Sequence, residues 1–384
     1  MAQQHLEPPT DSPAGPVSGD ALAGYLRAQA TEFLRSLRQH RETGPEAGAA
    51  ARAKPRTEAR TDARDVSGNV SRNVSRDLSR TGEYGSGGYG PGESVDAARA
   101  LRRSARRISG TLHTFRPMLD TDWSEGMRPE LAWLSGTLAR EHAYAARLER
   151  LLGALNRLSG AAGFPAQTAG NTGAPAKGSL TVGAAKAGAL LDRQLTLART
   201  RAHSAALQAL GSSRFHAVAD SVAVLASEVP LTPAATTADL RPLAAAATDR
   251  LTDAVAALPL LTAGHPYNAE ALVHGLSADT APHPQDAPWH QVRLLLRLHR
   301  YACEVLYGED APIDVRLLRA GQALNRHRDA AEAAAAAASA ARTPRIAPAT
   351  AYALGVLHAD QRHEVEAARF AFQQNWQKEA VRTP

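Results

Sequence analysis

Arginine side chains form one stripe of the stretch 98–115, which reads A-R-A-L-R-R-S-A-R-R-I-S-G-T-L-H-T-F. Wound as a helix at about 100° per residue, this stretch separates into two faces. The apolar face is formed by Leu101, Ala105, Ile108, Leu112 and Phe115. The opposite face is formed by Arg99, Arg102, Arg103, Arg106 and Arg107, and it carries no carboxylate. Guanidinium groups held this close repel one another unless anions bind between them, so the stretch predicts half of an anion-binding site.

An alternative interpretation is a solvated, arginine-rich surface. Arginine supplies nearly all of the cations of this chain, so a codon preference for arginine would produce the same stripe without any ligand. Ordinary solvent faces of helices, however, mix charges of both signs, because opposite charges three or four residues apart stabilise each other. The missing carboxylates therefore favour the anion site.

A second basic stripe follows Asp286 and Pro288, in the segment W-H-Q-V-R-L-L-L-R-L-H-R-Y-A-C-E-V-L. One narrow arc of this expected helix contains His290, Arg293, Arg297 and Arg300. Almost all of the remaining circumference is apolar, which is typical of a helix buried in a protein core. Unpaired buried charges are costly, so we expect this stripe to face an anion-binding cleft that it shares with the first stripe.

Composition narrows the classes of protein that the chain can belong to. It has 384 residues, a net charge of +6, 44% hydrophobic residues and a single cysteine. One cysteine excludes a disulfide framework and a cysteine-based zinc site, which fits a reducing cytoplasm. The N-terminus lacks the pattern of a signal peptide, and no apolar run approaches the ~20 residues of a membrane span. We expect a soluble cytoplasmic protein that does not associate with membranes.

Helical patterns recur along the chain and strand patterns are nearly absent, which predicts an all-α fold. The expected helices cover about 20–40, 98–115, 129–158, 184–210, 212–228, 238–257, 288–306, 313–341 and 349–380. Low-complexity composition predicts disorder in 1–17 and 43–92, and a flexible insert in 159–182. One basic helix in each half suggests an internal duplication, with a first half of about 18–210 and a second half of about 211–384.

Five segments together resemble the CHAD family, the conserved histidine α-helical domain. The first, R-A-L-R-R-S-A-R-R-I-S-G-T-L-H-T-F-R-P-M-L, is similar to the opening motif of that domain, and the Trp289 segment is similar to its counterpart in the second half. The segments A-L-N-R-H-R-D-A and A-Y-A-L-G-V-L-H follow in the expected order, and A-G-Y-L-R-A-Q is similar to the first helix of the family. The resemblance covers roughly 18–384 without the two inserts.

The resemblance implies two antiparallel helical bundles related by pseudo-twofold symmetry, with a basic channel between them. Family members bind inorganic polyphosphate in this channel and can associate with polyphosphate granules. Matched by position, the basic residues of the family correspond to Arg102, Arg106, Arg107, His290, Arg293, Arg297 and Arg300, with His327 and Asp329 further along the chain. The expected polyphosphate site consists of these residues without Asp329, together with Arg99, Arg103 and Arg326.

Three positions depart from the family pattern. Arg99 stands where the first motif usually begins with histidine, Leu298 replaces a basic residue beside Arg297, and Ala143 replaces a usual aspartate. These changes keep the positive charge of the site but weaken any chemistry that depends on histidine.

Two other functions remain as alternatives. Fourteen histidines allow a metal-dependent phosphohydrolase, but the chain has no H-E-x-x-H motif, P-loop or E-x-E-x-K signature, and His358 and His363 are spaced poorly for one metal. Nucleic-acid binding fits the net charge, yet the stripes lack interleaved aromatic residues apart from Tyr301. The sequence therefore favours non-catalytic polyphosphate binding, without a cofactor or a metal.

Overall fold

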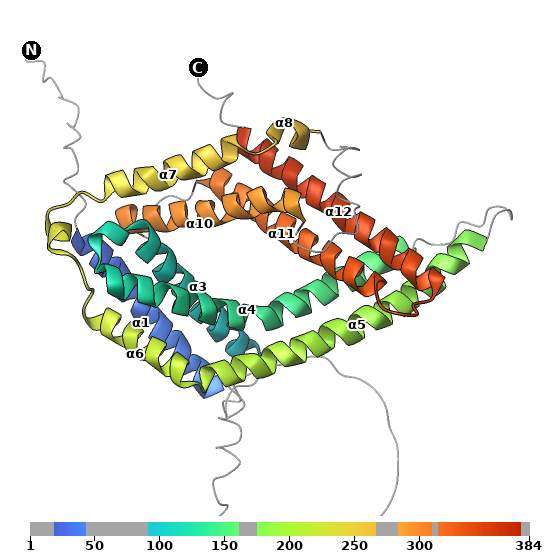
Figure 1. The fold of residues 1–384 in the computed structure, drawn as a ribbon, viewed down its shortest axis with the longest axis horizontal. Helices are drawn as coiled ribbons and strands as arrows, with labels where there is room; N and C mark the ends of the chain where they lie inside the picture. Colours follow the sequence, from blue (N-terminus) through green and yellow to red (C-terminus); the bar gives the residue numbers. More distant parts are fainter. Residues whose placement is uncertain (1–18, 44–90, 161–174, 266–282, 309–313, 378–384) are drawn as a thin grey trace, which may run out of the picture.

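Helices are the only long elements of secondary structure in the described part of the chain. The structure is a computed structural model that describes residues 19–43, 91–160, 175–265, 283–308 and 314–377 (Figure 1). Its helices are α1 (Gly19–Thr43), α3 (Pro91–Thr114), α4 (Thr121–Leu158), α5 (Pro175–Leu210), α6 (Ser213–Ser227), α7 (Arg241–Ala256), α8 (Leu260–Ala263), α10 (Ala287–Tyr307), α11 (Val315–Ala341) and α12 (Pro348–Gln377). The prediction of an all-α fold is confirmed.

Local interactions of the residues around Pro117 and Asp120 explain where α3 ends and where α4 begins. A short 3-10 helix, Arg116–Met118, follows the end of α3, since Pro117 lacks the N–H group that continuation would need. The next helix, α4, begins before Pro129 because the Asp120 side chain accepts a hydrogen bond from the backbone N–H of Trp123. Pro129 therefore lies inside α4, and the start predicted for this helix at about 129 was wrong.

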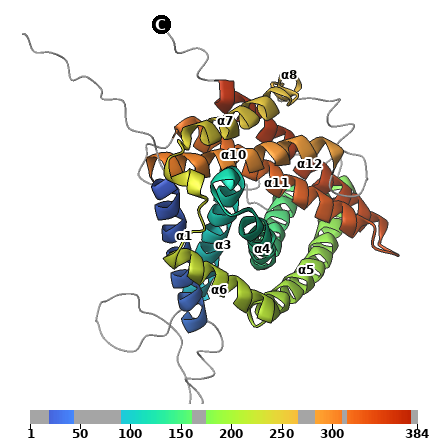
Figure 2. The same cartoon turned by 60° about the vertical axis from the view of Figure 1, so that its left-hand side comes forward.

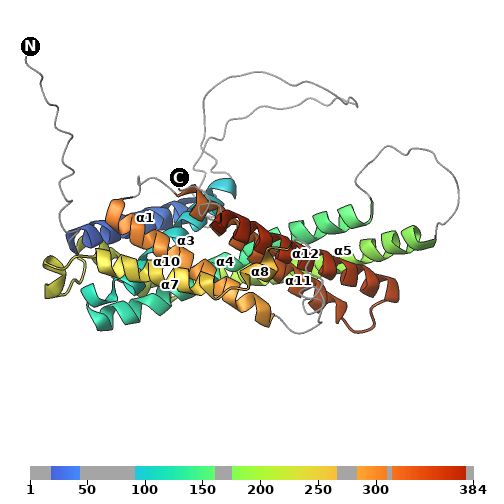
Figure 3. The ribbon, with the colours of Figure 1, turned by 90° about the horizontal axis from the view of Figure 1, so that it is seen from above.

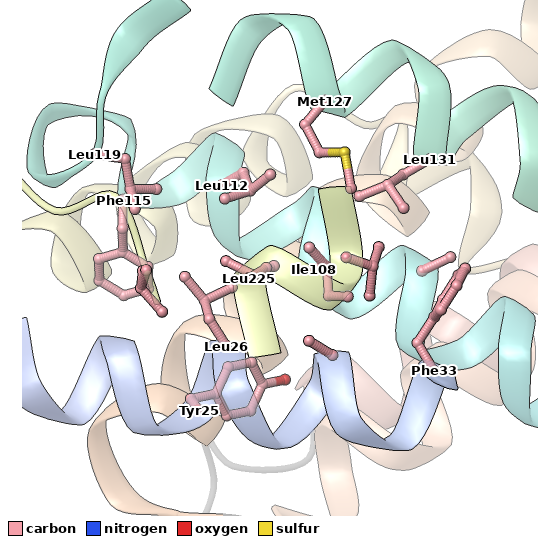
Figure 4. Packing of buried hydrophobic residues seen from close by; sticks show 14 of the residues in the cluster. Tyr25, Leu26, Phe33, Ile108, Leu112, Phe115, Leu119, Met127, Leu131 and Leu225 are labelled. Atoms are coloured by element: carbon pink, nitrogen blue, oxygen red, sulfur yellow. The ribbon is translucent and has the colours of Figure 1, made fainter. Parts of the chain in front are cut away.

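The first hydrophobic core joins α1, α3, the first part of α4, and α6. Its fully buried members include Phe33, Ile108, Leu131 and Phe215, and Figure 4 shows how side chains from these helices meet. The apolar face predicted for 98–115 is part of this core, because Leu101, Ala105, Ile108, Leu112 and Phe115 are all 0% exposed. Burial of this face fixes the rotation of α3 and turns its arginines away from the core.

Two further cores extend the molecule away from α1. The second forms between the end of α4, α5, α11 and α12, and the third between α7, α8, α10, α11 and α12. Figure 1 shows α4 and α5 running from the side of α1 and α6 toward α12. Because α6 shares the first core with α1 and α3, packing crosses the boundary expected near residue 210. The pseudo-twofold relation of two halves stays a prediction.

The expected inserts fall mainly outside the described residues. The ranges 1–17 and almost all of 43–92 are not described, and neither are residues 161–174 of the insert predicted at 159–182. The helix α5 already begins at Pro175, however, so the last part of the second expected insert is helical. In the same way, α3 begins at Pro91, at the end of the insert expected at 43–92.

The helix α10 packs against helices from several parts of the chain. It contacts α7, α11, α3 and α1. Figures 2 and 3 show α10 beside α3 on one side and α7 on the other. Within the described residues, no helix combines the length and apolar character needed to cross a membrane.

Candidate anion-binding site

The two predicted arginine stripes approach each other where α3 passes α10. Arg102 and Arg106 come from α3, and Arg293 and Arg297 from α10. Arg106 interacts electrostatically with Arg297, and Arg293 interacts with both. All four are half-buried, and their rotation follows from the burial of the apolar faces beside them. Tertiary packing thus brings together positive charges that are almost 200 residues apart in the sequence.

Mutual repulsion and burial act together on these arginines. Burial first, and then the charges of Arg106 and Arg328, lower the pKa of Arg102 to about 10. Burial, followed by Arg297 and Arg328, lowers the pKa of Arg293 to about 9. Each group stays protonated at neutral pH, so the site holds concentrated positive charge. A bound anion would relieve both the repulsion and the loss of hydration.

Hydrogen bonding in the protein leaves much of this donor capacity unused. The Nε atoms of Arg102, Arg293 and Arg297 are buried without a hydrogen-bond partner among the described residues. Arg106 Nε donates to Ser135 Oγ at 2.9 Å, and one terminal nitrogen of Arg293 donates to Asn325 Oδ1 at 3.2 Å. Both acceptors are neutral, so neither compensates the charge of its arginine.

A fifth arginine, Arg328 of α11, completes the group. It acts electrostatically on Arg102, Arg106, Arg293 and Arg297. Its guanidinium pairs with Asp329 and lies 3.9 Å from Glu332. We call these five residues the arginine cluster.

The sequence prediction chose Arg326 instead of Arg328. Two residues turn an α-helix by about 200°, so the two side chains leave α11 in nearly opposite directions. Arg326 is exposed and is not among the charges that shift the pKa of Arg102, Arg106, Arg293 or Arg297. The apolar face of α11 could have distinguished the two arginines, because the buried Leu324 lies close in angle to Arg328 and nearly opposite Arg326.

Arg107 and Arg300 were expected to bind the ligand, but both pair with Glu304 instead. Arg107 donates two hydrogen bonds to this carboxylate, from Nε at 2.8 Å and from a terminal nitrogen at 3.1 Å. Arg300 Nε donates to Glu304 at 2.8 Å, and the Tyr25 hydroxyl donates at 2.7 Å. Burial would raise the pKa of Glu304, but the hydrogen bonds from Arg107 and Tyr25 lower it below its usual value. Arg107 therefore joins α3 to α10, and its role in ligand binding stays a prediction.

Arg99 and Arg103 lie outside the arginine cluster. Arg99 is exposed and pairs with Asp96 one turn earlier at 3.1 Å, so the predicted stripe does have a carboxylate at its start. Its charge still acts on Arg102, which places it at the outer edge of the cluster. Arg103 is exposed and is not among the charges that shift the pKa of Arg102 or Arg106. Rotation about the axis of α3 separates it from the cluster.

His327 is buried in a network of charged residues around Asp286. Only 1% of its side chain is exposed, and its Nε2 lies 3.4 Å from Asp286 and accepts a hydrogen bond from Arg369 Nε at 3.3 Å. The carboxylate of Asp286 also accepts hydrogen bonds from Arg362 at 2.8 Å and Arg369 at 2.7 Å. Burial lowers the pKa of His327 to about 4, so it is neutral at pH 7. The sequence did not reveal this buried carboxylate and its two arginines, and the contacts that the structure describes for His327 are structural, so its binding of the ligand stays a prediction.

Two other histidines border the arginine cluster. His290 of α10 packs edge-on against the His327 ring, and burial followed by the charges of Arg293 and Arg328 lowers its pKa. His142 of α4 was not predicted, and burial followed by Arg99 and Arg102 lowers its pKa in the same way. Within the described ranges, no three residues among histidine, cysteine, aspartate and glutamate are grouped to hold a metal ion.

Comparison with known proteins identifies the family to which this chain belongs. The model of the CHAD domain matches residues 88–338 of this chain, well over half of its length. The chain belongs to the CHAD domain family. The resemblance seen in the five sequence segments is thereby confirmed. A similar solved structure is PptA from Streptomyces chartreusis, with 67% sequence identity, a TM-score of 0.70, and coverage of 94% of this chain and 100% of that chain. A comparison with curated proteins gave no match.

All five members of the arginine cluster lie inside the CHAD match, whereas α1 and α12 lie outside it. Both outer helices nevertheless hold the cluster in place. Tyr25 of α1 binds Glu304 near the end of α10, and Arg362 and Arg369 of α12 bind Asp286 at its beginning. The CHAD helix α10 is therefore fixed near both ends by buried carboxylates, and Arg293 and Arg297 between them form no ion pair with a carboxylate in the described part of the chain.

Proposed function

We propose that this CHAD protein is a non-catalytic module that binds inorganic polyphosphate through the arginine cluster. The observation that carries the proposal is the convergence of Arg102, Arg106, Arg293, Arg297 and Arg328 from three helices. Only Arg328 among them pairs with a carboxylate in the described part of the chain. The family match and the structural neighbour support an association with polyphosphate.

Polyphosphate suits this cluster for reasons of charge and shape. Its chain is narrow and carries about one negative charge per phosphate, so successive units can reach half-buried guanidinium groups. Each guanidinium can donate two parallel hydrogen bonds to phosphate oxygens. Nucleic acid is the weaker candidate, because single-strand binding relies on aromatic stacking and the two arginine stripes lack interleaved aromatic residues apart from Tyr301. Binding in a basic channel at the surface of polyphosphate granules would follow from the same chemistry.

A salt-dependent titration with matched arginine variants tests the proposal. Polyphosphate affinity is measured for the wild type, for the double variant Arg102→Ala/Arg106→Ala, and for Arg103→Ala as an exposed control on the same helix. We expect wild-type affinity to fall steeply with salt through counterion release. The double variant should lose about 100-fold or more, with a shallower salt dependence, whereas Arg103→Ala should change affinity by no more than about twofold.

Two results would contradict polyphosphate binding by the cluster. The first is an affinity that does not depend on salt, and the second is a double variant that binds as tightly as Arg103→Ala. Competition with single-stranded DNA at matched total charge separates the nucleic-acid alternative, since polyphosphate should displace DNA at lower concentration. Phosphate release from polyphosphate in the presence of Mg²⁺ or Mn²⁺ would support the phosphohydrolase alternative.

A further inference from the structure

Tyr301 lies where α3 and α10 come closest together. A Cβ atom added to Gly110 of α3 would be 2.6 Å from Cδ2 of the Tyr301 ring and 3.2 Å from a methyl carbon of Leu298. Such distances are far shorter than normal carbon contacts, so the Tyr301 ring packs directly on the backbone of α3 at Gly110. Glycine at this position thus sets the location of the ring.

The Tyr301 side chain lies close to polar and charged groups of three helices. It acts electrostatically on Arg106 of α3, on Arg297 of α10, and on Tyr25 of α1, the partner of Glu304. Tyr301 is half-buried, and its hydroxyl forms no hydrogen bond with the residues that the structure describes. A fixed aromatic ring therefore presents an unused donor beside two arginines whose charges are not neutralised.

We propose that the Tyr301 hydroxyl donates a hydrogen bond to the phosphate oxygen that Arg106 and Arg297 bind. This inference rests on the proposed function and adds a neutral donor to the arginine cluster. Hydrogen bonds to charged acceptors are roughly twice as strong as those between neutral groups, and a rigid ring loses little entropy when it forms one. The hydroxyl contributes direction and affinity without adding to the repulsion among the guanidinium groups.

The variant Tyr301→Phe tests the donor, because it removes the hydroxyl and leaves the ring on Gly110. Affinity for polyphosphate should fall about tenfold or more, as expected for a hydrogen bond to a charged group. The slope of affinity against salt should stay unchanged, because no charge is lost. The matched control is Tyr307→Phe on the same helix, whose side chain is 67% exposed, and its affinity should equal that of the wild type.

A second variant tests the placement of the ring from the opposite helix. Gly110→Ala keeps the hydroxyl but forces the ring away from α3, so it should lose at least as much affinity as Tyr301→Phe. Its control is Gly136→Ala in α4, where an added Cβ meets no atom within 4 Å. Circular dichroism and thermal unfolding establish that both variants fold, and Tyr301→Phe keeps the test decisive if Gly110→Ala does not.

The outcomes separate this inference from the proposed function. If Tyr301→Phe binds polyphosphate as tightly as Tyr307→Phe while Arg102→Ala/Arg106→Ala binds weakly, the tyrosine donor is refuted and the arginine site stands. A reduced salt slope in Tyr301→Phe would also refute it, since the loss would then come from displaced arginines. If neither tyrosine nor arginine variants lose affinity, the proposed function itself fails.

Discussion

Glu304 accepts two hydrogen bonds from Arg107, and this bidentate pair fastens α10 to α3 at distances of 2.8 and 3.1 Å. The pair divides the arginines of both helices into two groups. Arg107 and Arg300 neutralise Glu304 and stabilise the fold, whereas Arg102, Arg106, Arg293 and Arg297 have no carboxylate partner in the described structure. Two arginines of one helix, separated by a single turn or less, thus have different roles.

Replacing Arg107 should mainly affect stability. Arg107→Ala leaves the buried Glu304 carboxylate with Tyr25 and the exposed Arg300, and we expect unfolding to become easier by about 2–4 kcal/mol. Urea denaturation measures this change, with Arg35→Ala as a control because the Arg35–Glu32 pair is exposed. At temperatures where the variant is folded, polyphosphate affinity should change little. A variant as stable as wild type that binds as weakly as Arg102→Ala/Arg106→Ala would show that Arg107 contacts the ligand.

Arg328 and Arg326 form a matched pair on α11. Arg328→Ala removes a charge from the arginine cluster, so polyphosphate affinity should fall about tenfold and the salt slope should decrease by about one. Arg326→Ala removes the same charge from the opposite side of the helix and should leave both quantities nearly unchanged. Isothermal titration at several salt concentrations distinguishes them. The reverse ranking would restore Arg326 to the site and remove Arg328 from it.

Polyphosphate affinity should increase as the pH falls below the usual pKa of histidine. Burial and neighbouring arginines lower the pKa values of His142 and His290 in the free protein, so both are neutral at pH 7. A bound polyanion raises these pKa values, and linkage then requires tighter binding as protons are taken up. Between pH 7.5 and 5.5 we expect a gain of about tenfold.

The double variant His142→Gln/His290→Gln should lose most of this gain. An equivalent change at the exposed His216 of α6 serves as the control and should retain it. Equal pH dependence in the double variant and the control would exclude both histidines from the linkage.

Removal of Asp286 should destabilise the protein strongly. Asp286 is 2% exposed, and its carboxylate accepts hydrogen bonds from Arg362 and Arg369, which are buried as well. Asp286→Ala leaves these two cations with Glu366 alone, and we expect a loss of about 3–5 kcal/mol in the free energy of unfolding. Asp249→Ala, at an exposed position of α7, should cost no more than about 0.5 kcal/mol. Chemical denaturation of both variants at pH 7 makes the comparison.

His327 should make the protein less stable in mild acid. Burial lowers its pKa to about 4 in the folded state, compared with about 6.5 in the unfolded chain. Between these values the unfolded state binds the extra proton, so stability falls as the pH decreases from 6.5 to 4, by about 3 kcal/mol in total. His327→Gln should flatten this part of the stability curve, measured by urea denaturation across that range. An unchanged slope would assign the acid sensitivity to other groups.

The sequence determined the class of fold and the apolar faces of the helices. Spacings of three and four predicted that Leu101, Ile108 and Phe115 would be buried, and all three are. Since α-helical geometry is local, such a face follows from the order of the residues alone. The same geometry placed Arg102, Arg106, Arg293 and Arg297 on the faces that the structure turns toward each other.

Tertiary structure decided which charged residues are paired. The sequence contains Glu304 and Asp286, but their partners lie far away in the chain, on α3 and α1 for Glu304 and on α12 for Asp286. Long-range contacts of this kind pair Arg107 and Arg300 with Glu304, place His327 beside Asp286, and bring Arg328 rather than Arg326 close to the arginines of α3 and α10. A helical wheel gives the direction of a side chain, whereas the charge it meets depends on which distant helix packs there.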